Sequence, residues 1–261
     1  MTRDTLKSGD TTLSIRIDGD ADKPWIVLSN SLATDLHMWD DQIALLSQTH
    51  RIVRYDTRGH GQSGVPDGPY DFDMLVGDML AVLDHVGADT ADVMGLSLGG
   101  MTALGLGLTH PGRVRRMVVC DARADNPPPF VSGWDDRIAL IENGGMEAIA
   151  PGTLDRWFTD TVTPDVVARA NAMICGTPVA GYVACARALQ GLGYLGHLHN
   201  LYLPVLYVVG EEDHAAPVAA MQGMTDATPG ATLTVLPGLA HVPNMQDPAA
   251  FGAAVLPWLR G

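Results

Sequence analysis

The five residues Gly95-Leu96-Ser97-Leu98-Gly99 decide how this chain is expected to fold. An apolar stretch, residues 91–96, leads directly into Ser97, and a stretch rich in small residues, residues 98–109, follows at once. A Gly-x-Ser-x-Gly pattern between a strand and a helix is typical of a sharp turn that raises a serine hydroxyl above the edge of a sheet. Glycine is needed on both sides of the serine because the turn brings strand and helix close together. We therefore predict that Ser97 lies exposed at a strand-to-helix turn.

Strands and helices continue to alternate on both sides of this turn. Apolar or alternating runs indicate strands at residues 11–17, 25–28, 51–55, 91–96, 114–120, 204–209 and 232–236. Helical spacing of apolar residues indicates helices at residues 39–47, 71–86, 98–109, 218–225 and 248–259. Continuous apolar strands separated by helices predict an α/β fold with a parallel sheet covered on both faces.

The alternation stops after Asp121. Three prolines at residues 127–129 predict a loop, and short helical pieces broken by Gly and Pro follow, without a convincing strand. We therefore expect a core made of residues 1–122 and 203–261. Residues 123–202 are expected to form an inserted helical lid, called the lid segment below.

Composition limits the partners that this chain can have. The 261 residues include 30 Asp and Glu against 16 Lys and Arg, which gives a formal net charge of −14. Such a charge repels nucleic-acid phosphates and anionic membrane surfaces, so neither is an expected partner. The polar N-terminus resembles no signal peptide, and no apolar run approaches the ~20 residues of a membrane span. Three scattered cysteines, without a disulfide framework or zinc-like spacing, fit a reducing cytoplasm.

A serine hydroxyl is a weak nucleophile and needs a general base that is itself oriented by a carboxylate. Asp213 follows the strand at 204–209, and His241 follows the strand at 232–236. Residues at the carboxyl ends of parallel strands meet at one edge of the sheet, so we predict that Ser97, Asp213 and His241 form a catalytic triad. Three other carboxylates compete with Asp213 for the orienting role: Asp121, Glu211 and Glu212.

Acyl transfer also needs N–H donors directed at the oxyanion that develops on the substrate. The usual donors are the residue after the nucleophile and one in the loop after the first central strand, which correspond to Leu98 and Leu32. The alternative is that Ser29-Asn30-Ser31-Leu32 is only a polar connecting loop.

The triad and its strand order make the chain resemble the α/β-hydrolase superfamily. Further characteristic stretches are Trp25-Ile26-Val27-Leu28-Ser29-Asn30-Ser31-Leu32, Thr34-Asp35, Met38-Trp39, Arg54-Tyr55-Asp56-Thr57-Arg58-Gly59-His60-Gly61 with Ser63, Gly68-Pro69-Tyr70, Arg156-Trp157-Phe158-Thr159 and Ala240-His241-Val242-Pro243-Asn244. Through these stretches the chain resembles, within the superfamily, the bacterial 3-oxoadipate enol-lactonases. The resemblance implies an α/β-hydrolase fold with a mostly parallel eight-stranded sheet. It also implies a serine hydrolase that opens a lactone through an acyl-enzyme, with the substrate and water as partners and no metal or organic cofactor.

The enol-lactone carries a carboxylate, so the resemblance also implies a basic residue near the site. The first candidate is Arg137, near Trp134, and three further arginines are alternatives: Arg123, Arg156 and Arg187. Each can equally be a surface or packing arginine. Trp134 and Trp157 either pack the lid segment or line the mouth of a substrate pocket.

Other functions share the expected fold. A general carboxylesterase, a cofactor-free perhydrolase and a carbon–carbon bond hydrolase would use the same triad, so fold alone does not separate them. A non-catalytic binding module is the alternative from another class, but such a module would usually show a broken triad. His197 and His199 form an H-x-H pair without evident further ligands, so no metal site is expected.

Overall fold

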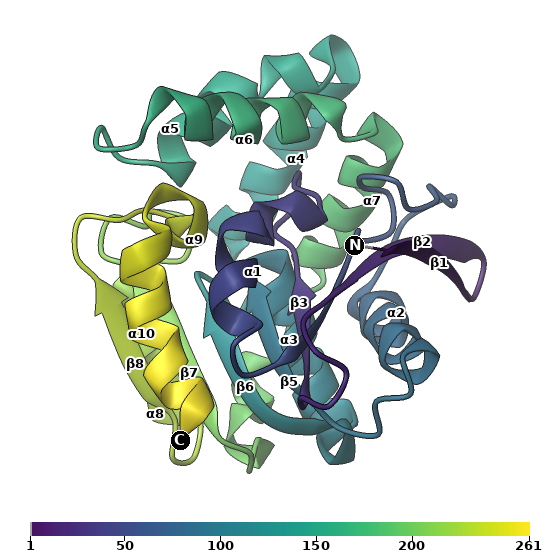
Figure 1. Cartoon of the computed structure of the whole chain (residues 1–261). Helices are drawn as coiled ribbons and strands as arrows, with labels where there is room; N and C mark the ends of the chain where they lie inside the picture. Colours follow the sequence, from purple (N-terminus) through teal and green to yellow (C-terminus); the bar gives the residue numbers. More distant parts are fainter. Residues whose placement is uncertain (1) are drawn as a thin grey trace.

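One eight-stranded sheet forms the centre of the molecule in the computed structural model, which describes residues 2–261 (Figure 1). Its strands are β1 (Thr2–Ser8), β2 (Thr11–Asp18), β3 (Trp25–Ser29), β4 (Arg51–Tyr55), β5 (Ala91–Leu96), β6 (Val114–Cys120), β7 (Val205–Gly210) and β8 (Thr232–Leu236). They lie in the order β1-β2-β4-β3-β5-β6-β7-β8. Strands β3 to β8 pair in parallel, whereas β2 pairs antiparallel with both β1 and β4. The predicted mostly parallel eight-stranded sheet is confirmed.

Strand β1 is the one strand that the sequence pattern does not indicate. It pairs with β2 from Thr2 opposite Ile17 to Ser8 opposite Thr11, and Gly9 at the connecting turn has a φ of 55°. Leu6 is its only buried hydrophobic residue. An antiparallel edge strand can expose most of its side chains to water, so it needs few apolar residues and resembles a polar terminus in sequence.

Helices cover both faces of the sheet. Those of the core are α1 (Asp40–Leu46), α2 (Phe72–His85), α3 (Leu98–Thr109), α8 (Val218–Ala227), α9 (Pro243–Gln246) and α10 (Pro248–Arg260), with the short 3-10 helices η1 (Leu36–Trp39) and η2 (Pro111–Arg113). A further 3-10 helix, η4 (Leu195–Asn200), lies at the end of the lid segment. From β3 to β4 the chain moves across the sheet toward β1, and from β4 to β5 and β6 it moves in the opposite direction, toward β8. Right-handed crossovers therefore place α1 and α2 on opposite faces, with α3 beside α2 and α10 beside α1.

The lid segment contains four helices: α4 (Pro128–Gly144), α5 (Ala150–Trp157), α6 (Pro164–Gly176) and α7 (Val179–Gln190), with the 3-10 helix η3 (Met146–Ala148) between α4 and α5. They gather at one end of the molecule, at the top of Figure 1. The predicted proline loop is partly wrong, because Pro128 and Pro129 form the first turn of α4. Proline fits there since the first N–H groups of a helix have no intrahelical partner.

The lid segment lies directly on the loop that follows β4. A Cβ atom on Gly181 of α7 would lie 2.1 Å from the carbonyl oxygen of Gly59, so the two backbones touch with no room for a side chain. Within residues 2–261, no single helix is long and apolar enough to cross a membrane, and only α6 and α7 together reach that length, across a 94° bend.

Candidate active site

Ser97 lies at the turn between β5 and α3, in a strained backbone conformation. Its φ is 54° and its ψ is −116°, a region that residues with a side chain rarely adopt. Its N–H donates to the carbonyl of Cys120, 2.8 Å away. A Cβ atom on Gly95 would lie 2.2 Å from the Gly99 oxygen, and one on Gly99 would lie 2.2 Å from the Ser29 oxygen. The two glycines are therefore required by contact, and the turn lies where the sequence places it.

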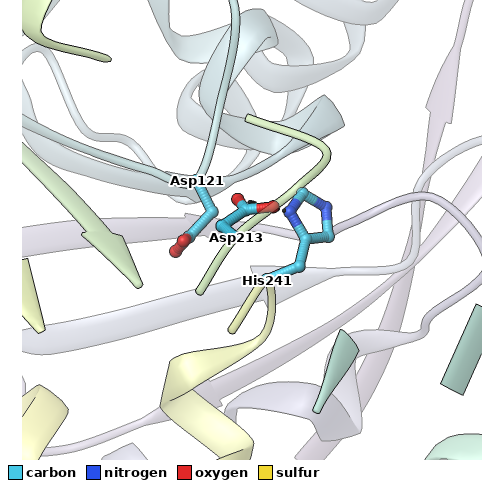
Figure 2. Close-up of side chains that lie close together, drawn as sticks. All are labelled: Asp121, Asp213 and His241. Carbon is cyan, nitrogen blue, oxygen red and sulfur yellow. Dashed lines mark hydrogen bonds and ion pairs between the residues drawn. The ribbon is translucent and has the colours of Figure 1, made fainter. Parts of the chain in front are cut away.

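His241 joins Ser97 to Asp213. The Asp213 Oδ2 atom lies 2.8 Å from His241 Nδ1, and His241 Nε2 lies 3.1 Å from Ser97 Oγ; the first of these two contacts is drawn in Figure 2. An ionised carboxylate only accepts hydrogen bonds, so Nδ1 carries a hydrogen and neutral His241 presents a lone pair on Nε2. This is the form that can accept the proton of the Ser97 hydroxyl.

Asp213 is ionised although it is buried. Burial opposes its charge, but attraction to the imidazolium form of His241, together with hydrogen bonds from His241 and from the N–H groups of Ala215 and Ala216, outweighs burial and lowers the pKa of Asp213 below the usual value. Those two N–H groups lie 2.7 Å and 3.1 Å from Oδ1. Both carboxylate oxygens of Asp213 are thus occupied, which fixes the plane of the carboxylate against the imidazole.

Asp121 lies next to Asp213 (Figure 2), and its pKa is shifted in the opposite direction. Its Oδ1 accepts the N–H of Gly210 at 2.8 Å, and its Oδ2 has no hydrogen-bond partner among residues 2–261. Complete burial, together with the neighbouring charge of Asp213, raises the pKa of Asp121 well above its usual value. Both effects favour the neutral carboxylic acid form of Asp121 over its carboxylate.

Only Asp213, of the four acids considered from the sequence, forms a hydrogen bond with His241 within the described chain. Glu211 accepts the N–H of Gly238 at 3.1 Å, and both Glu211 and Glu212 are exposed. Asp121, Asp213 and His241 offer ligand atoms within 4.8 Å of one another, an arrangement that could also hold a metal ion. Two of those atoms, Asp213 Oδ2 and His241 Nδ1, are already hydrogen-bonded to each other.

Leu98 and Leu32 lie at the two places expected for oxyanion donors. Leu98 is the first residue of α3, so its N–H has no intrahelical acceptor. Leu32 lies in the tight turn in which the Thr34 N–H donates to the Ser31 carbonyl at 3.3 Å. The Leu32 N–H itself donates to no acceptor among the described residues. Two N–H groups are therefore available near Ser97.

A cavity of about 550 Å³ opens between the triad and the lid segment. Ser97 and His241 line its floor side, and Leu32 lines the same cavity. The three residues predicted to contact substrate, Trp134, Arg137 and Trp157, also line it. The structure therefore brings the predicted lid residues to the same cavity as Ser97 and His241.

Arg137 differs from the other candidate arginines in its partners. Its Nε donates to the Tyr182 hydroxyl at 2.7 Å, its Nη2 donates to the Thr153 hydroxyl, and its guanidinium lies 5.9 Å from the Trp134 ring centroid. No carboxylate within residues 2–261 pairs with it. Its positive charge is therefore held in the cavity by neutral groups.

The other three arginines are less suited to bind an anion in this cavity. Arg123 lines the cavity but pairs with Asp125 at 2.8 Å, and Arg156 lines it from an exposed position. Arg187 pairs with Asp135 at 2.6 Å and lies outside the cavity. The sequence does not reveal Thr153 and Tyr182 as the groups that orient Arg137, because they lie on two other helices, α5 and α7, whose packing against α4 has no local sequence signal.

Residues 24–248 match the family described as the alpha/beta hydrolase fold. The chain belongs to this family. 3-Oxoadipate enol-lactonase 2 of Acinetobacter baylyi is 34% identical over 256 residues, which cover 97% of this chain and 95% of that protein. 3-Oxoadipate enol-lactonase 1 of the same organism is 32% identical over 243 residues, which cover 92% of this chain and 90% of that protein.

A solved structure shows the same similarity. The crystal structure of the enol-lactonase from Burkholderia xenovorans LB400 matches with a TM-score of 0.95 and 35% identity, covering 99% of this chain and 100% of that chain. The α/β-hydrolase fold and the resemblance to enol-lactonases predicted from the sequence are confirmed, and the protein is a hydrolase.

Proposed function

We propose that this hydrolase opens 3-oxoadipate enol-lactone to 3-oxoadipate, with Ser97 as its nucleophile. The observation that carries the proposal is the continuous hydrogen-bonded series from Asp213 through His241 to Ser97 at the base of a cavity. The similarity to enol-lactonases over almost the whole chain supports the choice of substrate.

The reaction follows from the geometry of these side chains. Ser97 Oγ attacks the lactone carbonyl while His241 Nε2 accepts the hydroxyl proton. The negative charge that develops on the carbonyl oxygen is stabilised by the N–H groups of Leu32 and Leu98. The carbon–oxygen bond of the ring then breaks, the enol oxygen takes the proton from His241, and an acyl-enzyme remains.

Water completes the cycle. His241 removes a proton from water, which attacks the ester carbonyl of the acyl-enzyme, and the proton returns to Ser97 Oγ as the product leaves. The product leaves as the enol of 3-oxoadipate, and a proton shift from the enol oxygen to carbon gives the ketone. Asp213 stabilises the imidazolium that forms in each half of the reaction, because its carboxylate accepts the Nδ1–H of His241. These steps require no metal and no organic cofactor.

Arg137 is proposed to bind the carboxylate of the substrate. It carries a positive charge in the cavity without an acidic partner in the described chain, while the protein as a whole has a formal charge of −14. A guanidinium can form two parallel hydrogen bonds with a carboxylate, which fixes both position and orientation. We propose that the lid segment selects the substrate through Arg137, with Trp134 and Trp157 as apolar walls.

Initial rates on three substrates test this proposal: 3-oxoadipate enol-lactone, a neutral lactone and a short nitrophenyl ester, with Ser97→Ala as the blank. We expect a preference for the enol-lactone in kcat/KM by orders of magnitude, and a loss of turnover in Ser97→Ala on all three. A preference for the neutral substrates would replace the lactonase assignment with a general carboxylesterase. Turnover by Ser97→Ala at the wild-type rate would contradict the serine mechanism itself.

A further inference from the structure

His60 is a completely buried histidine that the proposed reaction does not use. Both of its ring nitrogens have backbone partners: Nδ1 lies 3.1 Å from the Arg58 carbonyl oxygen, and Nε2 lies 3.1 Å from the Ala33 nitrogen. A carbonyl only accepts and an amide N–H only donates. The ring must therefore carry its hydrogen on Nδ1 and a lone pair on Nε2.

The protonation state of His60 agrees with this geometry. Burial lowers the pKa of His60 to about 4, so the ring is neutral near pH 7 and its Nε2 can accept the Ala33 N–H. The loop that carries His60 is itself fixed. The guanidinium of Arg58 donates to both oxygens of Asp78, at 2.7 Å and 2.9 Å, and Gly59 touches Gly181 of α7.

His60 accepts a hydrogen bond from the N–H of Ala33, the residue after the proposed oxyanion donor Leu32. Ala33 follows Leu32 directly, and its φ of 64° lies in the left-handed region, which is unfavourable for a residue with a Cβ atom. Such a conformation persists only where the surroundings enforce it. The N–H of Ala33 is bound by His60, whereas the N–H of Leu32 donates to no acceptor among residues 2–261.

The two ends of this loop have anchors of their own. On one side, Asn30 donates to the Tyr55 carbonyl at 2.7 Å and accepts from Trp39 at 3.0 Å. On the other side, the Leu36 N–H donates to Asp56 at 2.8 Å. Within the turn, the Ser31 N–H donates to Met38 Sδ at 3.3 Å and the Thr34 hydroxyl donates to the Ser31 carbonyl at 2.7 Å, both on the side before Leu32. The contact with His60 fixes the residue on the other side of Leu32.

We propose that His60 is a positioning residue: by accepting the Ala33 N–H, it holds the turn so that the Leu32 N–H faces the oxyanion formed at Ser97. This inference rests on the proposed serine mechanism. His60 does not touch the substrate, and it acts through backbone geometry alone. It is expected to affect the transition state, in which the oxyanion is fully developed, more than the binding of the substrate.

A matched pair of variants separates this role from a general packing role. The amide oxygen of His60→Gln can reach the place of Nε2 and accept from Ala33, whereas the shorter side chain of His60→Asn can reach only the place of Nδ1. We expect kcat of His60→Asn to fall by about 10- to 100-fold with KM nearly unchanged, because small misplacements of catalytic groups have effects of this size. His60→Gln is expected to retain most of kcat.

Two further measurements keep the test decisive. Affinity for a boronic acid, which forms a tetrahedral adduct on Ser97, should fall with kcat in His60→Asn, while affinity for 3-oxoadipate should not. Labelling by a serine-reactive phosphonate measures the fraction of protein with a reactive Ser97. A wild type that is not labelled would contradict the serine mechanism, whereas a labelled His60→Asn variant with reduced kcat would show the loss of the His60 contribution alone. An equal decrease of kcat in both variants, or an unchanged kcat in His60→Asn, would overturn the proposal.

The wild-type protein provides a test that does not depend on how the variants fold. Nitrogen-15 spectra should show His60 as the neutral Nδ1–H tautomer, with a scalar coupling across the hydrogen bond between Ala33 N and His60 Nε2. The Nε2–H tautomer would be incompatible with the proposed role, since that nitrogen would then have no lone pair for the Ala33 N–H.

Discussion

At the scale of single residues, the carboxyl groups of Asp213 and Asp121 lie next to each other beside His241, and their pKa values are shifted in opposite directions. Replacing Asp213 by Asn removes the charge that stabilises the imidazolium and favours the wrong tautomer, so kcat should fall by about 10⁴-fold. The matched variant Asp121→Asn exchanges one neutral group for another and should leave kcat nearly unchanged. Steady-state rates under saturating substrate compare the two. Equal losses in both variants would show that Asp121 shares the orienting role.

Arg137 provides a second prediction at this scale. Arg137→Met removes the charge and keeps much of the side-chain volume, so kcat/KM for the anionic enol-lactone should fall by about 10- to 100-fold, the usual worth of a charged hydrogen bond. The rate on a neutral nitrophenyl ester should change little. Arg187→Met is the control, because Arg187 pairs with Asp135 and lies outside the cavity. Similar losses on both substrates would exclude Arg137 as the carboxylate ligand.

At the scale of elements, the active-site cavity depends on a close contact between the start of α3 and the end of β3. A Cβ atom on Gly99 would lie 2.2 Å from the Ser29 oxygen and 2.9 Å from the Asn30 nitrogen. Gly99→Ala should therefore displace the loop that carries Leu32, lower the free energy of unfolding by about 1–3 kcal/mol and reduce kcat. Thermal unfolding and rate measurements on one preparation test both effects.

Gly77 in α2 is the control for this substitution. A Cβ atom there meets no heavy atom within 4 Å, and the position is exposed. Gly77→Ala should raise the free energy of unfolding by about 0.5–1 kcal/mol, because alanine loses less backbone entropy in a helix. If Gly99→Ala unfolds and turns over like the wild type, the contact is not what positions the loop.

Elements whose sequence signal is local were predictable, and contacts between distant elements were not. The turn at Ser97 follows from five consecutive residues between a strand and a helix, and the positions of Asp213 and His241 follow from the ends of their strands. Strand β1 was not predicted because Leu6 is the only hydrophobic residue in its sequence, while Asp4, Thr5 and Lys7 are exposed at the edge of the sheet. The hydrogen bond from Ala33 to His60 joins two different loops, and the sequence of neither loop indicates that the two are in contact.

At the scale of the whole molecule, buried charges connect parts of the sheet and its helices. Arg58 is paired with Asp78 of α2, and Arg54 of β4 with Asp18 of β2. Asp92 of β5 accepts from His50 at 2.8 Å. Breaking such a pair leaves a buried charge without compensation, so the stability of the folded state depends on the protonation of buried groups.

The free energy of unfolding should therefore vary with pH, and the variants His60→Gln and Asp121→Asn can separate the contributions of these two residues. In the unfolded chain His60 takes up a proton near pH 6.5, but in the native state its pKa is about 4. The wild type should lose about 3 kcal/mol of stability from this residue as the pH falls from 6.5 to 4. His60→Gln lacks this loss, so its stability relative to the wild type should increase as the solution is acidified.

Asp121→Asn should show the opposite dependence. Because the native pKa of Asp121 is raised, the unfolded chain ionises first, and the wild type loses stability as the pH rises above about 4. The difference in free energy of unfolding between Asp121→Asn and the wild type should therefore shift in favour of the variant toward neutral pH. In acid this pH-dependent advantage should be absent. Urea unfolding of the three proteins at pH 4, 5.5 and 7 measures both trends. Differences that do not vary with pH would mean that neither group holds the protonation state assigned to it.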